Sequence, residues 1–328
     1  MSRTRLATIA LAAIVAAALP LVMRSDAWLS MAITTLLFVF LGQSWNVLGG
    51  YGGQFSFGHA VFFGSGAYAT AVLQVKLGMP AIVAAFGGMA AGAFVGAFIG
   101  ALSFRYGLRG SYFALVTLAF AEVFRIVASS LGITGAGFGI LIPLDARALN
   151  LQFPSRLAFY YVVLALVGIG FAISIGLERS RFGAWLMAVR ENEDAAKALG
   201  IDAFRVKLGA IIVSGAMAAT AGVFYAQYFL FIDSGIAFGP HVSVEALLGP
   251  IIGGLGTAFG PIVGGILLHT LGDLAKRVMG DAPGLSLVLY GVLLIVMLRF
   301  LPDGLNGLLR RLFARSPHGV AKRMPANA

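Results

Sequence analysis

The sequence predicts an all-α polytopic membrane protein, and three properties of the chain point to this fold class. The mean hydropathy is +0.94, and 11% of the 328 residues are charged, against about a quarter in soluble proteins. The apolar residues form long runs, and about 20 apolar residues in a helix span the hydrocarbon core of a bilayer with every backbone group satisfied. The 44 glycines favour close approach between membrane helices.

The composition excludes several classes of function. The chain has no cysteine, so it has no disulfide and no cysteine-ligated metal. Its four histidines, His59, His241, His269 and His318, are scattered rather than clustered. The net charge is +10. We interpret the basic residues as signals for the orientation of the chain in the membrane, because nucleic-acid binding needs a basic patch on a soluble surface. We therefore expect no cofactor, metal or nucleic acid on this chain.

Ten apolar runs are long enough, or nearly so, to cross the membrane. The first, residues 6–23, has the shape of a signal peptide, but an uncleaved span is preferred because further membrane helices follow directly. The others are residues 28–48, 57–75, 80–104, 111–131, 157–177, 208–230, 242–254, 259–274 and 285–301. We expect one transmembrane domain over residues 1–328, with about ten transmembrane or re-entrant helices.

The positions of Lys and Arg predict the orientation, because cytoplasmic loops retain these residues. With the amino terminus inside and ten crossings, 16 basic residues lie in the cytoplasm and six outside, and Arg125 lies within a span. Both termini are then cytoplasmic, and residues 302–328 form a cytoplasmic tail. The loop at 132–156 lies outside, and its length suggests a docking or lid role.

Two glycine patterns predict close packing. Gly88, Gly92, Gly96 and Gly100 recur at every fourth position, so they lie near one helix face and let another helix approach. The runs 242–254 and 259–274 are short and interrupted by Gly and Pro. Broken helices of this kind are tolerated where they are buried in protein or line a cavity. The sequence leaves open whether they are two spans or a re-entrant pair.

Five polar residues are candidates for a translocation path. Gln54, Ser56 and His59 belong to a glycine-rich segment whose unwound backbone either faces a solute or forms a packed re-entrant turn. Glu122 and Arg125 share a helix face within the bilayer and can pair. Charges in the membrane mark functional sites by default, and the alternative is a structural ion pair or snorkelling at the membrane edge.

Other polar features bear on the energy source. His241 with Glu245, and His269 with Asp273, have i, i+4 spacing near the expected membrane edges, which favours interfacial hydrogen bonds over a proton relay. No series of intramembrane carboxylates suggests proton coupling. The sequence has no G-x-x-x-x-G-K-[ST] phosphate loop, so the chain cannot hold ATP by that cradle. Any energy used must come from another chain.

The stretch 178–207 interrupts the apolar sequence with eleven charged residues. Within it, residues 192–199 (NEDAAKAL) predict a short helix, with Glu193 and Asp194 in the first turn and Gly200 after its end. Eight residues give a length of about 12 Å, and three alanines leave a slim profile. Such a helix can lie along the membrane surface or enter a groove of a docked protein.

These residues resemble those of a known family, the LivM-type permease subunits of ABC importers for branched-chain amino acids. The resemblance runs from about residue 36 to residue 305. It rests on the stretches GYGGQFSFGHAVFFGSGAYA, ALVTLAFAEVFRIV, AVRENEDAAKALGIDAFRVKLGAIIVSGAMAATAGVFYA and EALLGPIIGGLGTAFGPIVGG. Asp194-Ala195-Ala196 followed by Gly200 is similar to the EAA-x-x-x-G coupling motif, with Asp in place of Glu and without the usual Ile-x-Leu-Pro.

The resemblance implies an ABC importer permease fold in a prokaryotic inner membrane. It implies a heterodimer with a homologous LivH-type subunit, two cytoplasmic ATPase subunits that bind ATP and Mg, and a periplasmic or lipid-anchored binding protein. The stretch 178–207 is then the cytoplasmic coupling loop. The residues expected to couple to the ATPases are Arg190, Glu191, Glu193, Asp194, Ala195, Ala196, Leu199 and Gly200.

Other functions stay open at this point. One is a stand-alone secondary transporter or channel, in which Glu122, Arg125 and the glycine-rich segment form a gated path for a small polar solute. Another is a permease of the same family for urea, amides or aromatic acids. A membrane-embedded enzyme is weakly supported, because no nucleophile, metal cluster or carboxylate pair stands out.

Overall fold

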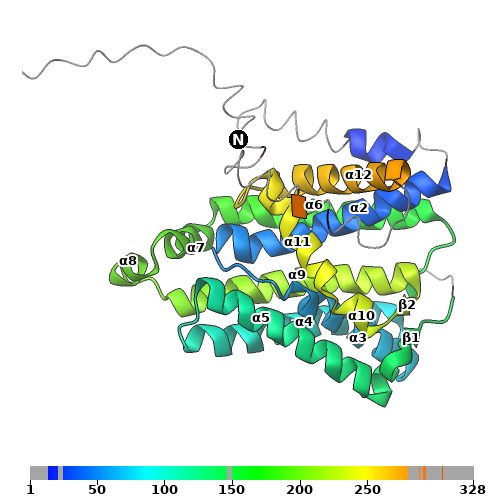
Figure 1. Ribbon diagram of the computed structural model, residues 1–328, viewed down its shortest axis with the longest axis horizontal. Coiled ribbons are helices and arrows are strands. Elements are labelled where there is room, and N and C mark those ends of the chain that lie inside the picture. Colours follow the sequence, from blue (N-terminus) through cyan, green and yellow to red (C-terminus); the bar gives the residue numbers. More distant parts are fainter. Residues whose placement is uncertain are drawn as a thin grey trace, which may run out of the picture.

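The structure is a computed structural model that describes residues 14–20, 25–145 and 150–279, together with residues 288, 291, 292 and 305. The described part is a bundle of α-helices with one very short β-ribbon (Figure 1). Within these described residues, six segments are long and apolar enough to cross a bilayer, by length and composition: 26–51, 81–105, 110–130, 156–179, 203–229 and 234–253. The prediction of an all-α, multi-pass membrane protein is confirmed. The predicted run 285–301 and the tail 302–328 lie almost wholly outside the described residues.

The elements follow the predicted runs closely, because apolar composition sets where helices can exist. The helices are α2 (Asp26–Trp45), which continues as the π-helical turn η1 (Asn46–Tyr51), α3 (His59–Val75), α4 (Ala81–Arg105), α5 (Gly110–Ser130), α6 (Arg156–Arg179), α7 (Arg181–Glu191), α8 (Glu193–Ala198), α9 (Ala203–Phe229), α10 (Ser234–Ala237), α11 (Pro240–Gly253) and α12 (Gly260–Met279). Residues 14–20 are also helical.

The connection from α5 to α6 carries two 3₁₀ turns, η2 (Gly132–Thr134) and η3 (Ala136–Phe138), followed by strand β1 (Ile140–Leu141). This strand pairs antiparallel with β2 (Phe231–Ile232), which follows α9. The ribbon ties the loop to the end of α9, and Phe138 in the preceding turn is 92% exposed. In the described part of the loop predicted at 132–156, this short pairing therefore holds residues 140 and 141 beside the segment that follows α9.

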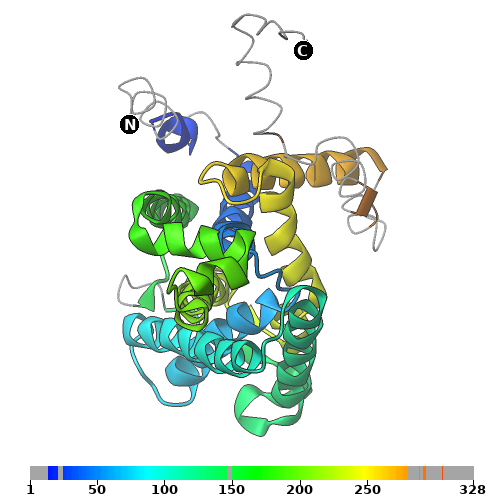
Figure 2. The ribbon, with the colours of Figure 1, turned by 90° about the vertical axis from the view of Figure 1, so that its left-hand side faces the viewer.

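The helices run between two ends of the molecule, with α7 and α8 at one end and β1 and β2 at the other (Figure 1). We call these the α8 end and the β end. Seen from the α8 end, α4 lies on one side of the bundle and α12 on the opposite side (Figure 2). Between them, α4 packs on α9, α9 on α2, and α2 on α11 and α12.

The predicted row of glycines on α4 lies at helix contacts. A Cβ atom on Gly92 would come 2.7 Å from a backbone oxygen of α9, and one on Gly96 would come 2.8 Å from another. Gly100 also faces α9, and Gly88 faces both α3 and α9. The two backbones approach so closely because no side chain separates them.

The two interrupted runs form a helical hairpin of α11 and α12. A Cβ atom on Gly249 of α11 would lie 3.3 Å from the Cα atom of Gly265 of α12. Gly254 (φ 125°) and Gly256 (φ 67°) take positive φ in the turn, a conformation that glycine adopts without steric cost. The second helix has 20 residues and is longer than the predicted run 259–274.

Candidate functional site

The stretch 178–207 contains two helices rather than one. Ser180 caps α7 by accepting a hydrogen bond from the backbone N–H of Gly183 at 3.0 Å. Asn192 is extended and caps α8, accepting from the N–H groups of Asp194 and Ala195 at 3.1 and 3.0 Å. The helix predicted at 192–199 is therefore only six residues long, because Asn192 and Leu199 are its capping residues. The preceding helix α7 was not predicted.

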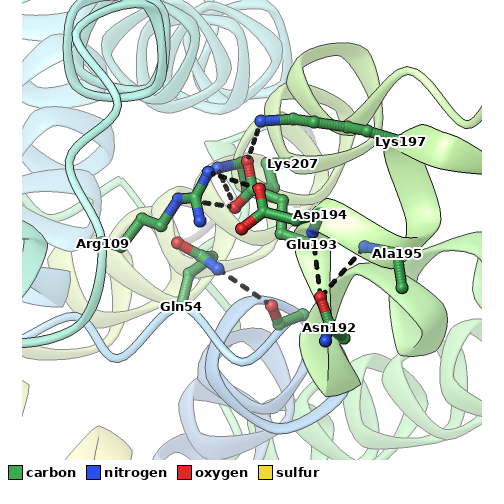
Figure 3. A network of polar contacts seen from close by, with 9 residues as sticks. Gln54, Arg109, Asn192, Glu193, Asp194, Ala195, Lys197 and Lys207 are labelled. Carbon is green, nitrogen blue, oxygen red and sulfur yellow. Dashed lines mark hydrogen bonds and ion pairs between the residues drawn. The ribbon is translucent and has the colours of Figure 1, made fainter.

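Glu193 is the centre of a polar network at the start of α8 (Figure 3). Its Oε2 atom lies 3.1 Å from Nε of Arg109 and 3.0 Å from Nζ of Lys207, and its Oε1 atom lies 2.9 Å from Nζ of Lys197. Arg109 precedes α5 and Lys207 belongs to the second turn of α9. One carboxylate therefore joins α8 to two long helices.

Burial makes the contact with Lys207 different from the others. The Lys207 side chain is 2% exposed and that of Glu193 is 10% exposed, whereas Arg109 and Lys197 are 45% and 48% exposed. The Lys207 ammonium also lies 4.8 Å from the centre of the Phe104 ring, a favourable cation–π placement. Burial alone would raise the pKa of Glu193, but the hydrogen bonds from Lys197 and Lys207 and the charges of Lys207 and Arg109 hold that pKa below its usual value.

The predicted coupling residues divide between two faces. Glu193 and Ala196 face the protein, and Ala196 is 2% exposed. Arg190 is exposed on one side but also binds a backbone group of another element. The remaining residues are exposed, and Leu199 is 82% exposed. They are Glu191, Asp194, Ala195, Leu199 and Gly200. A helix with one face exposed to a partner and the other bound to the rest of the protein is suited to transmit a partner's movement.

Arg190 fixes the end of α7 against the π-helical turn. Its Nη1 atom donates to the backbone oxygen of Gly50 at 2.7 Å. The Arg190 side chain passes so close to Gly53 and Gly256 that a Cβ atom on either glycine would come within 2.7 or 2.8 Å of it. These glycines therefore leave room for the arginine.

Two more polar side chains join helix ends beside this arginine. Asn46 donates through Nδ2 to the backbone oxygen of Thr257 at 3.0 Å and accepts from the N–H of Gly256 at 2.9 Å. Glu178, in the last turn of α6, accepts from the Tyr51 hydroxyl at 2.9 Å and from the N–H of Ala258 at 3.0 Å. We call Asn46, Glu178 and Arg190 the helix-end junction, because they join η1, α6, α7 and the α11–α12 turn.

The structure does not gather the five candidate path residues into one channel. His59 is fully buried, and its Nε2 atom lies 2.9 Å from the Ser214 hydroxyl of α9. Gln54 donates to the backbone oxygen of Gly52, and Ser56 accepts from the N–H of Gly58. These contacts pack the segment against the protein, and whether its backbone also faces a solute stays a prediction.

The other two candidates lie on a different surface. Arg125 donates through Nε to Glu122 at 2.8 Å, so the predicted pair forms. Their side chains are 37% and 49% exposed on the outer face of α5. Gln54, Ser56 and His59 thus lie apart from Glu122 and Arg125 in the fold, and the role of these residues in a translocation path stays a prediction.

Sequence reasoning missed the partners of Glu193 and the helix-end junction. Arg109 and Lys207 lie 84 and 14 residues away from Glu193 in the sequence, so local spacing gives no signal of this contact. For Asn46 and Glu178, the available signal was polarity at the ends of apolar runs. That signal marks where a helix leaves the membrane but does not identify a partner.

Together these features define a multi-pass helical membrane protein with a charged helical loop held firmly at one end. A family model described as "Branched-chain amino acid transport system / permease component" matches residues 27–298, and the chain belongs to this family. The resemblance stated from the sequence is confirmed.

Individual relatives agree with this assignment. The LivM permease protein of Escherichia coli K12, named a high-affinity branched-chain amino acid transport system permease, is 31% identical over 310 residues, covering 86% of this chain and 71% of the relative. LivM of Salmonella typhimurium is 30% identical over 304 residues, covering 84% and 69%. The E. coli LivH permease is 30% identical over a shorter stretch of 136 residues, 42% of this chain and 43% of the relative. No solved structure matches.

Proposed function

We propose that this chain is a transmembrane permease subunit of an ATP-driven importer for branched-chain amino acids. The observation that carries the proposal is the docking of α8. At the position of the predicted coupling motif, a short helix exposes Asp194, Ala195 and Leu199, while Glu193 on its other side binds Arg109 and Lys207. Family membership and the names of the relatives support the transport role and the substrate class.

The proposal includes the partners and the topology. The chain pairs with a homologous LivH-type subunit, binds two ATPase subunits that hold ATP and Mg at the α8 end, and receives substrate from a binding protein at the β end. It crosses a prokaryotic inner membrane about ten times, with both termini in the cytoplasm. The distribution of Lys and Arg supports this orientation.

In the proposed mechanism, ATP favours the closed pair of ATPases, and their movement displaces α8. Because Glu193 joins α8 to the residue before α5 and to α9, the displacement reaches both long helices without a flexible link. Arg190 carries the same displacement to η1 through its hydrogen bond to Gly50. The membrane helices then change their relative positions as packed bodies.

Replacing Ala195 by Trp tests the proposal. Ala195 is exposed on α8, so the indole leaves the fold intact but occupies the surface that a partner would contact. In proteoliposomes that contain the purified complex, we expect ATP hydrolysis to persist while ATP-driven L-leucine uptake falls at least tenfold. Arg205→Trp, at an 84% exposed position in the same loop, is the matched control. Normal coupled uptake in the Ala195→Trp variant, or leucine uptake by this chain alone driven by an ion gradient, would contradict the proposal.

A further inference from the structure

A cavity of about 640 Å³ opens between α2, α6, α9, α11 and α12. Small-molecule sites have volumes of about 300–1,000 Å³. Most of the residues that line it come from the loop before α6, the start of α6, the end of α9 and the part of α2 beside them, and others come from the middle of α11 and α12. The start of α6 and the end of α9 lie toward the β end, away from α8 (Figure 1), so the cavity lies nearer that end.

Ionisable groups of both signs line this cavity. Arg156, the first residue of α6, supplies a guanidinium, whereas Glu245 of α11 and Asp273 of α12 supply carboxyl groups. The cation therefore comes from a different helix than either acidic residue, and a ligand in the cavity can meet charges of both signs.

The guanidinium of Arg156 is held in place by neighbouring groups. Its Nη1 atom donates to the backbone oxygen of Asp26 at 3.0 Å and to the Ser30 hydroxyl at 2.9 Å. The Tyr228 hydroxyl, from α9, lies 3.2 Å from the same Ser30 hydroxyl. A guanidinium has five N–H donors in a planar fork, so Arg156 can use Nε and Nη2 for a carboxylate while Nη1 fixes its position.

Aromatic rings form the apolar part of the wall. The Phe38 ring stacks on that of His269 with centroids 5.1 Å apart, and the Phe159 ring meets that of Tyr228 edge to face at 5.1 Å. All four rings line the cavity. A small branched hydrocarbon group can bury its surface here, at about 25 cal/mol for each Å² removed from water.

We propose that this cavity binds the zwitterionic group of an amino acid with an apolar side chain, with its carboxylate at Arg156, its ammonium at Asp273 and Glu245, and its side chain against Phe38 and Phe159. This inference rests on the proposed function and adds a substrate site within this chain, separate from the binding protein. A zwitterion offers a group to both kinds of charge in the cavity. A solute with one charge, or with none, offers a group to one kind or to neither, and that selects against it.

The test uses the chain in lipid nanodiscs without the binding protein, with L-leucine as the probe and saturation-transfer difference NMR, which detects weak binding. Two analogues keep the α-carbon and side chain of leucine but lose one charge: 4-methylpentanoate lacks the ammonium group and isopentylamine lacks the carboxylate. We expect L-leucine to bind and each analogue to bind at least tenfold more weakly. Equal binding of either analogue, or no binding of leucine, overturns the inference.

Variants test the residues themselves. Arg156→Gln and Asp273→Asn should each weaken leucine binding at least tenfold, and Arg156→Lys, which keeps the charge and one donor group, should recover part of it. Lys76→Gln removes a cation at an exposed position after α3, also toward the β end, and should leave binding unchanged. Leucine binding by Arg156→Gln and Asp273→Asn equal to that of the parent protein would overturn the inference.

Transport separates this inference from the proposed function. If the parent complex imports leucine with ATP and the two cavity variants import it equally well, the cavity site is wrong and the proposed function stands. If the parent complex imports no branched-chain amino acid, both are wrong.

Discussion

The change of Glu193 to Gln keeps the size of the side chain and removes its charge, so it isolates the electrostatic contribution to α8 docking. The carboxylate contacts three cations at 2.9 to 3.1 Å. In the variant, Lys207 keeps its position at 2% exposure but loses its opposite charge. A buried ammonium without a counter-charge is unfavourable, and the structure must either hydrate it or release α8.

The burial of each partner gives the expected magnitude. Breaking a buried ion pair costs about 3–5 kcal/mol, and the exposed contacts to Arg109 and Lys197 add about 0–1 kcal/mol each. A loss of about 3 kcal/mol corresponds to a factor of about 100 in an equilibrium constant. Since α8 has six residues, its own backbone hydrogen bonds cannot hold it once the docking is lost.

Hydrogen exchange, measured by mass spectrometry on the protein in nanodiscs, detects the loss of α8 docking directly. We expect the amides of residues 193–198 in Glu193→Gln to exchange about 100-fold faster, or at the rate of an unstructured segment. Asp194→Asn is the matched control, because Asp194 is 78% exposed and 3.4 Å from Arg109; its effect should stay below about fivefold. The double variant Glu193→Gln/Lys207→Met removes the buried cation and should recover most of the protection. Equal effects of the two single changes would refute the reasoning.

Three further results are expected. The cation partners of Glu193 hold its pKa below the usual value. The docking of α8 should therefore be fully present above about pH 4.3, the ordinary pKa of glutamate, and should be lost as the pH falls through the lowered pKa. Loss of α8 exchange protection already at pH 6 would contradict this. Gly92→Leu forces a side chain against the backbone of α9 and should destabilise the protein by about 1–3 kcal/mol, measured as a lower unfolding temperature in detergent. The control Gly168→Leu, on an open face of α6, should not lower the unfolding temperature. Asn46→Ala leaves the N–H of Gly256 without its acceptor, which costs about 1–3 kcal/mol; faster exchange in the α11–α12 turn, with no change in α4, would confirm it.

Much of the fold could be predicted because the bilayer restricts the alternatives. Runs such as 80–104 and 111–131 became α4 (Ala81–Arg105) and α5 (Gly110–Ser130), since a helix satisfies its own backbone and apolar side chains tolerate lipid. The spacing of Gly92 and Gly96 likewise placed both residues on one face, because helical geometry is local. Boundaries were less predictable: whether Asn192 continues a helix or caps it depends on one backbone torsion.

The candidate site was less accessible from the sequence. The short helix at 193–198 could be located because charge, alanine and a terminal glycine occur together there. Its docking could not, since the pairing of Glu193 with Lys207 depends on how α8 folds back on α9. Arg156, Glu245 and Asp273 are far apart in the sequence and line one cavity. Their proximity follows from the arrangement of α6, α11 and α12, which no local pattern encodes.

The helix-end junction has a consequence for how the bundle can deform. Asn46, Glu178 and Arg190 join η1, α6, α7 and the α11–α12 turn at one end, and the continuing helices α2, α6, α11 and α12 form walls of the cavity at the other. If these helices rotate as rigid bodies about the junction, the displacement of each helix grows with distance from it. A small rotation at the junction then gives a larger change in the width of the cavity.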